Sequence, residues 1–144
     1  MSVSLESLMR DQAAMPAPSA LVQLLAFAAI GGGAALSFVV VSALAVSALP
    51  AVPSWLVSAL CYAAYIVPVY LLHRRFAFRS DARHSHALPR YVVVQLVGLG
   101  LATVFSWLAY GVIGLPTATA AILVIALTSG INFLVLRGWA FARI

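Results

Sequence analysis

Two segments far apart in the chain place an arginine among aromatic residues at the same spacing. The first reads Tyr-Leu-Leu-His-Arg-Arg-Phe-Ala-Phe at residues 70–78, and the second reads Phe-Leu-Val-Leu-Arg-Gly-Trp-Ala-Phe at residues 133–141. Arg74 and Arg137 occupy the same position in the two segments. Guanidinium groups bind phosphate oxygens through paired hydrogen bonds. If the segments pack side by side, we expect Arg74, Arg137 and the neighbouring Arg75 to contact one phosphate.

Aromatic side chains around these arginines would form the walls of such a pocket and would suit a prenyl chain or a sugar face. The predicted wall residues are Tyr70, Phe76, Phe78, Asn132, Phe133, Trp139 and Phe141. For Asn132, a hydrogen bond between helices is the alternative role. His73 is a candidate for tuning the pocket by titrating near neutral pH, although such a histidine more often sits in the lipid headgroup layer.

The arginines also have an ordinary explanation that needs no ligand. At the end of a membrane helix, an arginine reaches the polar interface and interacts favourably with the negative end of the helix dipole. Anchoring of this kind accounts for one such helix end. Two ends that share the same aromatic–arginine spacing are harder to explain in this way, which favours the pocket hypothesis.

Other residue patterns that carry chemistry are missing from the sequence. It contains no nucleophile–base pair, no carboxylate pair and no glycine-rich phosphate loop outside its apolar segments. Cys61 is the only cysteine, and Asp81, His84 and His86 are too sparse to predict a metal site. We therefore expect no catalytic residue, no cofactor, no metal and no enzyme activity.

The composition predicts that lipid surrounds most of the chain. Hydrophobic residues make up 65% of the 144 positions and charged residues only 8%, whereas a soluble domain uses about 25% charged residues. A polar tail at residues 1–19 precedes a predicted membrane domain over residues 20–144. Four apolar runs predict transmembrane helices at about 20–49, 55–72, 91–110 and 116–136.

The arginines predict how these helices cross the membrane. Five arginines lie in the loop at 73–90 and two follow the last run, while the two other loops carry no charge. By the positive-inside rule, this loop and both termini are cytoplasmic. The predicted fold is an all-α membrane protein with four transmembrane helices arranged as two tandem hairpins. The glycines at 31–33 predict a packing seam where a neighbouring helix approaches closely.

The arginine–aromatic motifs resemble those of the GtrA-like family. The resemblance rests on residues 70–78 and 132–141, with further support from Phe27 ahead of Gly31, and it covers about residues 20–144. The chain departs from the family pattern at three positions where that pattern has asparagine. These positions are Val69, His73 and Leu136, whereas Asn132 keeps the family residue.

The resemblance implies that the chain moves a polyprenyl-phosphate-linked sugar across the inner membrane, as a flippase for cell-surface polysaccharide synthesis or glycan modification. The implied ligand is undecaprenyl phosphate bearing one sugar. Related domains occur fused to polyprenyl-phosphate glycosyltransferases, including some mannose synthases, so a separately encoded glycosyltransferase is the expected partner. Membrane lipids and a second copy of the chain in a homodimer are also expected partners, and nucleic acid is not.

Two other functions compete with transport. The chain is alternatively an anchor that recruits a polyprenyl-phosphate glycosyltransferase, with the loop at 73–90 as the docking surface. The other competing function is that of a small multidrug exporter, a class of protein that also has four short helices. Such antiporters need a carboxylate within the membrane. No Asp or Glu occurs between residues 12 and 80 or after residue 81, which counts against an exporter.

Overall fold

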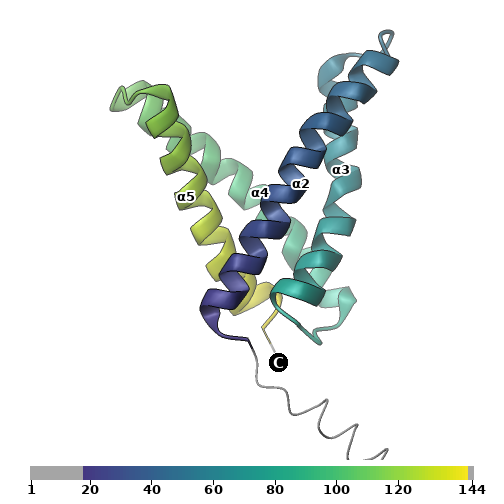
Figure 1. Ribbon diagram of the computed structural model, residues 1–144, viewed down its shortest axis with the longest axis vertical. Helices are drawn as coiled ribbons and strands as arrows, with labels where there is room; N and C mark the ends of the chain where they lie inside the picture. Colours follow the sequence, from purple (N-terminus) through teal and green to yellow (C-terminus); the bar gives the residue numbers. More distant parts are fainter. Residues whose placement is uncertain (1–17, 143–144) are drawn as a thin grey trace, which may run out of the picture.

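The computed structural model describes residues 18–142 and contains four long helices, labelled α2 to α5 in Figure 1. These are α2 (Ala20–Ala48), α3 (Ser54–Leu72), α4 (His84–Ser106) and α5 (Thr117–Val135). Three of them continue into wider turns of π-helix, which are η1 (His73–Ala77), η2 (Trp107–Val112) and η3 (Leu136–Ala140). Residues 18–142 form no strand, so the predicted all-α fold is confirmed. The predicted tail at residues 1–19 lies almost wholly outside the described residues.

Proline residues mark the start of two helices. Pro53 and Pro116 immediately precede α3 and α5, where a residue without an N–H group removes no helical hydrogen bond. The third helix differs from the predicted apolar run at 91–110, because α4 begins at His84. Hydropathy marks only the apolar part of a helix, so the polar first turns of α4 read as loop in the sequence.

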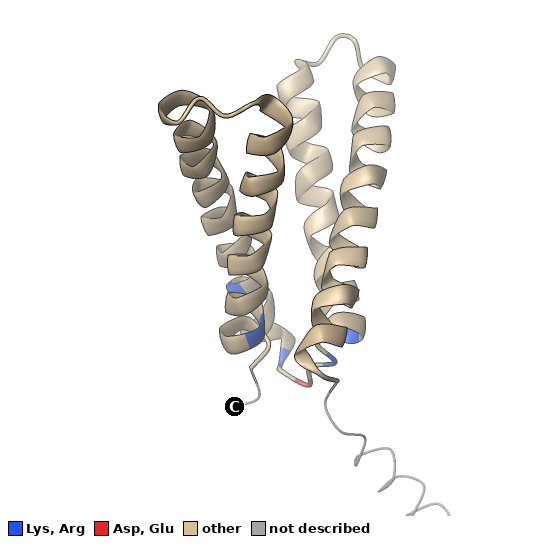
Figure 2. Cartoon of the chain, turned by 60° about the vertical axis from the view of Figure 1, so that its left-hand side comes forward, with Lys and Arg blue, Asp and Glu red and all other residues tan. Residues whose placement is uncertain are grey.

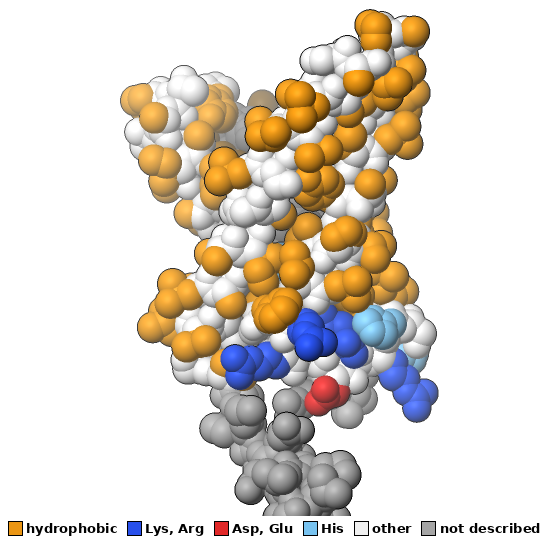
Figure 3. Space-filling model, turned by 45° about the vertical axis from the view of Figure 1, so that its right-hand side comes forward, with side chains coloured by type: hydrophobic (Ala, Val, Ile, Leu, Met, Phe, Trp, Pro, Cys, Tyr) orange, Lys and Arg blue, Asp and Glu red, His pale blue; other side chains and the backbone are white. Residues whose placement is uncertain are grey.

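All four helices are long and apolar enough to cross a membrane. The spans are Ala20–Ala48, Ser54–Ala77, His84–Val112 and Thr117–Ala140. Large apolar side chains on them are widely exposed, as at Leu36 (74%) and Trp55 (73%). The charged side chains gather at one end of the molecule, below this apolar surface (Figure 3). The chain is therefore a multi-pass membrane protein whose apolar surface faces lipid.

The four helices form two hairpins arranged as a V. α2 packs along α3, and α4 packs along α5. The hairpins meet at the end that carries the loop at 78–83 and both ends of the described chain, and they diverge toward the turns at 49–53 and 113–116 (Figure 1). The arginines lie at the same closed end (Figure 2). We call this the arginine end, and the segment 78–83 the arginine loop.

A buried core at the arginine end joins the two hairpins. Its members are Tyr70, Ala77, Phe78, Ala87, Tyr91, Val94, Phe133, Leu136, Ala140 and Phe141. Most of them belong to the two repeated segments. The motif that the sequence repeats is therefore the motif through which the hairpins pack.

The repeated segments contact one another reciprocally. Tyr70 of the first segment stacks on Phe141 of the second, with ring centroids 5.8 Å apart, and the equivalent Phe133 stacks on Phe78 at 5.7 Å. Phe78 and Phe141, which are themselves equivalent, stack at 5.0 Å. Such exchange of contacts is expected of two units related by an approximate twofold axis that runs along the hairpins. The prediction of two tandem hairpins is confirmed.

The two segments also share a backbone conformation. The Phe78 N–H donates to the His73 carbonyl, and the Phe141 N–H donates to the Leu136 carbonyl, both at 2.9 Å. These bonds span five residues, one more than in an α-helix, and so shift the helical phase by about 100°. After each shift, the aromatic ring that ends the segment lies in the core.

Candidate functional site

The three arginines predicted to contact phosphate all lie at the arginine end. Arg74 is half-buried and donates from Nε (3.2 Å) and Nη2 (2.7 Å) to the Ala82 carbonyl, so it fastens the arginine loop to η1. Arg75 is exposed beside the Phe76 ring, 5.8 Å from its centroid, and Arg137 is exposed in η3. None of the three lines either of the two cavities described below. Their shared phosphate pocket stays a prediction.

The predicted wall residues divide into three groups. The buried group, which forms the core, is Tyr70, Phe78, Phe133 and Phe141. Phe76 and Trp139 are exposed, and the Trp139 ring lies under the Arg90 guanidinium at 5.3 Å. Asn132 lies apart from both groups, in a groove between the hairpins.

This groove is open rather than enclosed and has a volume of about 270 Å³. All four helices contribute to it. Its lining residues are Phe27, Gly31, Ala34, Ala35, Phe38, Tyr62, Tyr65, Ile66, Val69, His73, Tyr91, Gln95 and Asn132. The groove lies where the hairpins diverge. All of its lining residues belong to the apolar spans, and none belongs to the polar loops.

Polar side chains gather where the groove meets the core. His73 is buried (3% exposed), and its Nδ1 shares a hydrogen bond of 3.1 Å with the Tyr91 hydroxyl. Its Nε2 has no hydrogen-bond partner within residues 18–142, and its ring stacks on Phe27 at 4.8 Å. Gln95 lies one turn of α4 beyond Tyr91, and Asn132 faces the groove from α5. An imidazole, a phenol and two amides thus line this part of the groove.

A second polar level lies farther from the arginine end. Tyr65 lies about 12 Å along the helix before His73, and its hydroxyl shares a hydrogen bond of 2.6 Å with Ser37 Oγ. The Phe38 ring contacts Tyr62 and Tyr65 edge-on, with centroids 6.1 and 5.8 Å apart. Aromatic faces that carry hydroxyl groups offer both stacking and hydrogen bonding to a polar ligand.

Small residues of α2 keep the groove open. Gly31 lines it, and a Cβ added there would meet no atom within 4 Å. Gly32 and Gly33 do not line the groove, but a Cβ added at either would also meet no atom within 4 Å. The predicted packing seam at 31–33 is therefore not formed within the described chain, because no neighbouring helix approaches these glycines.

The groove tyrosines were not predicted from the sequence. The residues spaced by three and four along α3 and the start of η1, on one helix face, are Tyr62, Tyr65, Val69 and His73. That spacing is a readable signal. It does not show whether the face packs on another helix or opens on a groove.

Comparison with known families identifies the fold. The family described as GtrA/DPMS, transmembrane domain, matches residues 26–141. The chain belongs to this family. The matched stretch contains both repeated segments, the core and the whole groove lining, and it confirms the resemblance seen in the motifs. No curated protein and no solved structure matches the chain significantly.

Within this GtrA/DPMS domain, the positions that depart from the family's asparagines lie in different surroundings. Leu136 is fully buried in the core. Val69 and Asn132, which are equivalent in the repeat, both line the groove. The second hairpin thus presents an amide to the groove from this position, while the first hairpin presents the His73 ring one turn later.

Proposed function

We propose that this GtrA/DPMS domain binds a polyprenyl-phosphate-linked sugar and moves it across the bilayer along the groove between its hairpins. Membership of the family connects the chain with polyprenyl-phosphate sugar translocation or synthesis, and the proposal concerns translocation. One observation carries it. The groove, lined by all four helices, has polar side chains at two levels inside otherwise apolar spans.

A lipid-linked sugar has two parts with opposite requirements. Its prenyl chain is stable in lipid, whereas its phosphate and sugar lose hydrogen bonds to water when they enter the membrane. Polar side chains inside membrane spans normally face a protein interior or a water-filled cavity, where they mark substrate pathways. In an open groove, the prenyl chain stays in lipid while the polar head contacts the protein.

The two polar levels suit successive positions of the head. Near the arginine end it meets His73, Gln95 and Asn132, which can exchange hydrogen bonds with sugar hydroxyls. Farther along it meets Tyr62 and Tyr65, whose rings offer a face to the sugar. Each position replaces hydrogen bonds that the previous one provided, which lowers the cost of crossing.

The proposal includes an orientation and a partner. In this proposal the arginine end faces the cytoplasm, which the positive-inside rule favours, and the membrane is the inner membrane. Undecaprenyl phosphate bearing one sugar is the proposed ligand. A separately encoded glycosyltransferase supplies it, so the chain itself needs no catalytic residue. The delivered sugar serves cell-surface polysaccharide synthesis or glycan modification.

We also propose that two copies of the chain associate, because the groove of one copy, about 270 Å³, is small for a lipid-linked sugar. The second copy would enlarge the groove and leave it open to lipid for the prenyl chain. Chemical crosslinking in native membranes tests this, and a product pattern with monomer alone contradicts it.

The groove is tested by filling it. Gly31→Leu places a side chain in the groove, whereas Gly32→Leu places the same side chain on the neighbouring exposed position outside the groove lining. Both substitutions raise helix propensity by a similar amount. The proteins are reconstituted in liposomes, and the appearance of a labelled polyprenyl-phosphate sugar in the opposite leaflet is timed. We expect Gly31→Leu to slow transfer at least tenfold and Gly32→Leu to leave it within twofold.

The outcomes separate the competing functions. If the unmodified protein transfers the lipid no faster than empty liposomes, transport is wrong and recruitment of a glycosyltransferase takes its place. If transfer occurs but Gly31→Leu matches Gly32→Leu, the groove is not the pathway. Arg137→Ala, measured in the same assay, tests the predicted arginine contact independently of the groove.

A further inference from the structure

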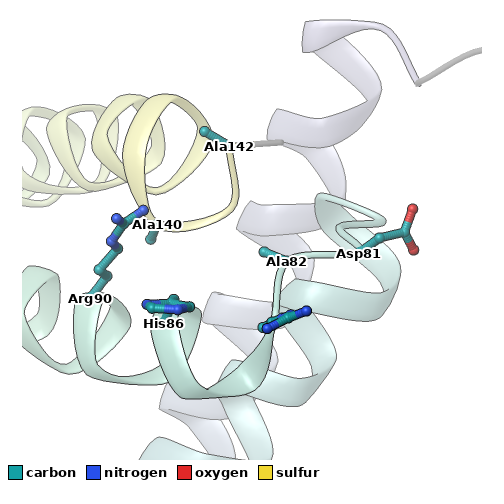
Figure 4. Close-up of a pocket in the computed structure, with 7 residues that line it drawn as sticks. Asp81, Ala82, His86, Arg90, Ala140 and Ala142 are labelled. Atoms are coloured by element: carbon teal, nitrogen blue, oxygen red, sulfur yellow. The ribbon is translucent and has the colours of Figure 1, made fainter. Parts of the chain in front are cut away.

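A second cavity, of about 400 Å³, lies at the arginine end and shares no residue with the groove. It is lined by Asp81, Ala82, Arg83, His86, Arg90, Ala140 and Ala142. Figure 4 shows His86 and Arg90 on α4, Asp81 and Ala82 on the arginine loop, and Ala140 and Ala142 on the end of the second repeat. Two stretches of the chain, residues 81–90 and 140–142, therefore line it.

The cavity is rich in hydrogen-bond donors and positive charge. Arg83 and Arg90 both line it, and His86 lies one helical turn from Arg90 on the same face of α4. Asp81 is its only acidic lining residue, and the carboxylate points away from His86 and Arg90 (Figure 4). With two arginines and one carboxylate, the lining carries a net positive charge.

Arg90 is held in place before any ligand arrives. Its Nη1 donates to the Trp139 carbonyl at 3.1 Å, and its guanidinium lies 5.3 Å from the Trp139 ring centroid. A guanidinium has five N–H donors in a rigid fork, so one recorded bond leaves most of the fork for a ligand. A donor that is already positioned loses little conformational entropy on binding.

The start of α4 adds to this field. Arg83 is the residue before the helix, and no side chain caps the first turn. The first turn also contains no acidic residue, so its free N–H groups and the positive end of the helix dipole are not neutralised there. This contribution supports the arginine side chains and does not replace them.

We propose that this cavity is a binding site for a phosphate group. Two arginines and a histidine around a space of this size suit a group with several anionic oxygens. The cavity lies at the ends of the membrane spans, since His86, Arg90 and Ala140 belong to their terminal turns. Membrane lipids hold their phosphates at about this depth, where basic pockets bind lipid headgroups. The small side chains of Ala82, Ala140 and Ala142 leave room for the phosphate. The inference stands on this cavity and not on transport through the groove.

Trp139 provides the measurement. Replacing the other two tryptophans (Trp55→Phe and Trp107→Phe) leaves Trp139 as the only one of the three, in contact with the arginine that faces the cavity. The protein is titrated in maltoside detergent, which contains no phosphate, with farnesyl phosphate, farnesol, phosphatidylglycerol and inorganic phosphate. We expect saturable changes in Trp139 emission with farnesyl phosphate and none with farnesol.

Variants place the binding in the cavity. Arg83→Gln keeps the Arg90–Trp139 contact and should raise the dissociation constant for farnesyl phosphate at least tenfold. Arg90→Gln removes the reporter contact, so its binding is read by calorimetry, with the same expectation. Arg79→Gln is the control, because Arg79 is exposed in the same loop and lines neither cavity. It should change the constant less than twofold.

The ligand arms identify the source of the phosphate. Tighter binding of farnesyl phosphate than of the other phosphates supports a site for prenyl lipids, and equal binding of phosphatidylglycerol supports a general headgroup site. Inorganic phosphate that binds as tightly as either lipid supports a site for free phosphate. The proposal is overturned if no phosphate compound gives saturable binding, or if Arg83→Gln and Arg90→Gln bind like Arg79→Gln. A failure here leaves the transfer assay through the groove unaffected.

Discussion

Phe78 and Phe141 stand at equivalent positions of the two repeated segments and stack on one another, with centroids 5.0 Å apart and ring planes at 22°. Each also stacks on the first aromatic residue of the opposite segment. The hairpins diverge beyond this point (Figure 1). The pair therefore carries much of the contact that holds the two hairpins together, and the groove begins beside it.

Truncating one ring of this pair should loosen the junction. We expect Phe78→Ala to lower the free energy of unfolding by about 2 kcal/mol, which is less than the 3–5 kcal/mol typical of soluble cores. Lipid solvates an exposed apolar surface, so the loss comes from packing and ring stacking and not from transfer to water. Denaturant unfolding in detergent measures it. The matched control is Phe76→Ala, since Phe76 belongs to the same segment but is 56% exposed. Equal losses for the two variants would contradict this role of Phe78.

Most of the fold is predictable because hydropathy and the internal repeat each indicate a different feature of it. Hydropathy locates apolar helices, since lipid requires about 20 apolar residues to span it. The repeat of aromatic–arginine–aromatic spacing shows that the two hairpins are alike. Neither signal contains the shift of phase in η1 and η3, because it depends on which backbone bonds form when the two segments meet.

The candidate site was harder to predict because most residues that line the groove lie outside the two repeated segments. The sequence predicts that Arg74 contacts a phosphate, yet its guanidinium donates to the Ala82 carbonyl and holds the arginine loop in place. The groove forms where the two hairpins separate, and no local sequence pattern indicates where they do so. In the sequence, Arg90 resembles the other arginines that set the topology, whereas in the structure it contacts Trp139 at the end of the second repeat.

Arg79 has a backbone conformation that favours glycine, with φ of +45°. The N–H of Ser80, which follows it, donates to the Arg74 carbonyl at 3.0 Å and closes the end of η1. Gly114 does the same after η2, with φ of +70° and a bond from Leu115 to Ala109. A residue with a Cβ is destabilised by about 1–2 kcal/mol in this region. Replacing it with glycine removes this strain but makes the unfolded chain more flexible, which offsets part of the gain in stability.

We therefore expect Arg79→Gly to raise the free energy of unfolding by about 0.5 kcal/mol, and Arg79→Val to lower it by about 1 kcal/mol, because β-branched residues fit this region worst. Thermal and denaturant unfolding in detergent measure both. Gly114→Ala is the companion variant and should destabilise by about 1 kcal/mol. A loss of stability in Arg79→Gly would show that the arginine side chain matters more there than the backbone.

The bond from Arg74 to Ala82 predicts local and not global effects. Arg74→Ala removes both donors to a carbonyl of the arginine loop, so amide hydrogen exchange over residues 78–83 should become about fivefold faster, or about 1 kcal/mol. Arg74→Lys, which keeps one donor, should fall between the two. The neighbouring Arg75 is exposed, and Arg75→Ala should leave the exchange of the loop unchanged. Faster exchange in both alanine variants would mean that charge, and not this bond, orders the loop.

The close approach of Gly98 and Asn132 predicts that substitutions at these two positions have coupled effects on the free energy of unfolding. A Cβ on Gly98 would lie 2.6 Å from Asn132 Nδ2 and 3.1 Å from its Cγ, so Gly98→Ala must push the amide out of its place beside the groove. We expect a cost of about 1–3 kcal/mol, the usual range for overpacking, and slower transfer of the lipid-linked sugar. Asn132→Ala should remove the clash, so the double variant should lose less stability than Gly98→Ala alone, which a double-mutant cycle of unfolding free energies measures. Gly100→Ala is the control in the same helix, because a Cβ there meets nothing within 4 Å. Additive losses in the cycle would show that Gly98 does not act through Asn132.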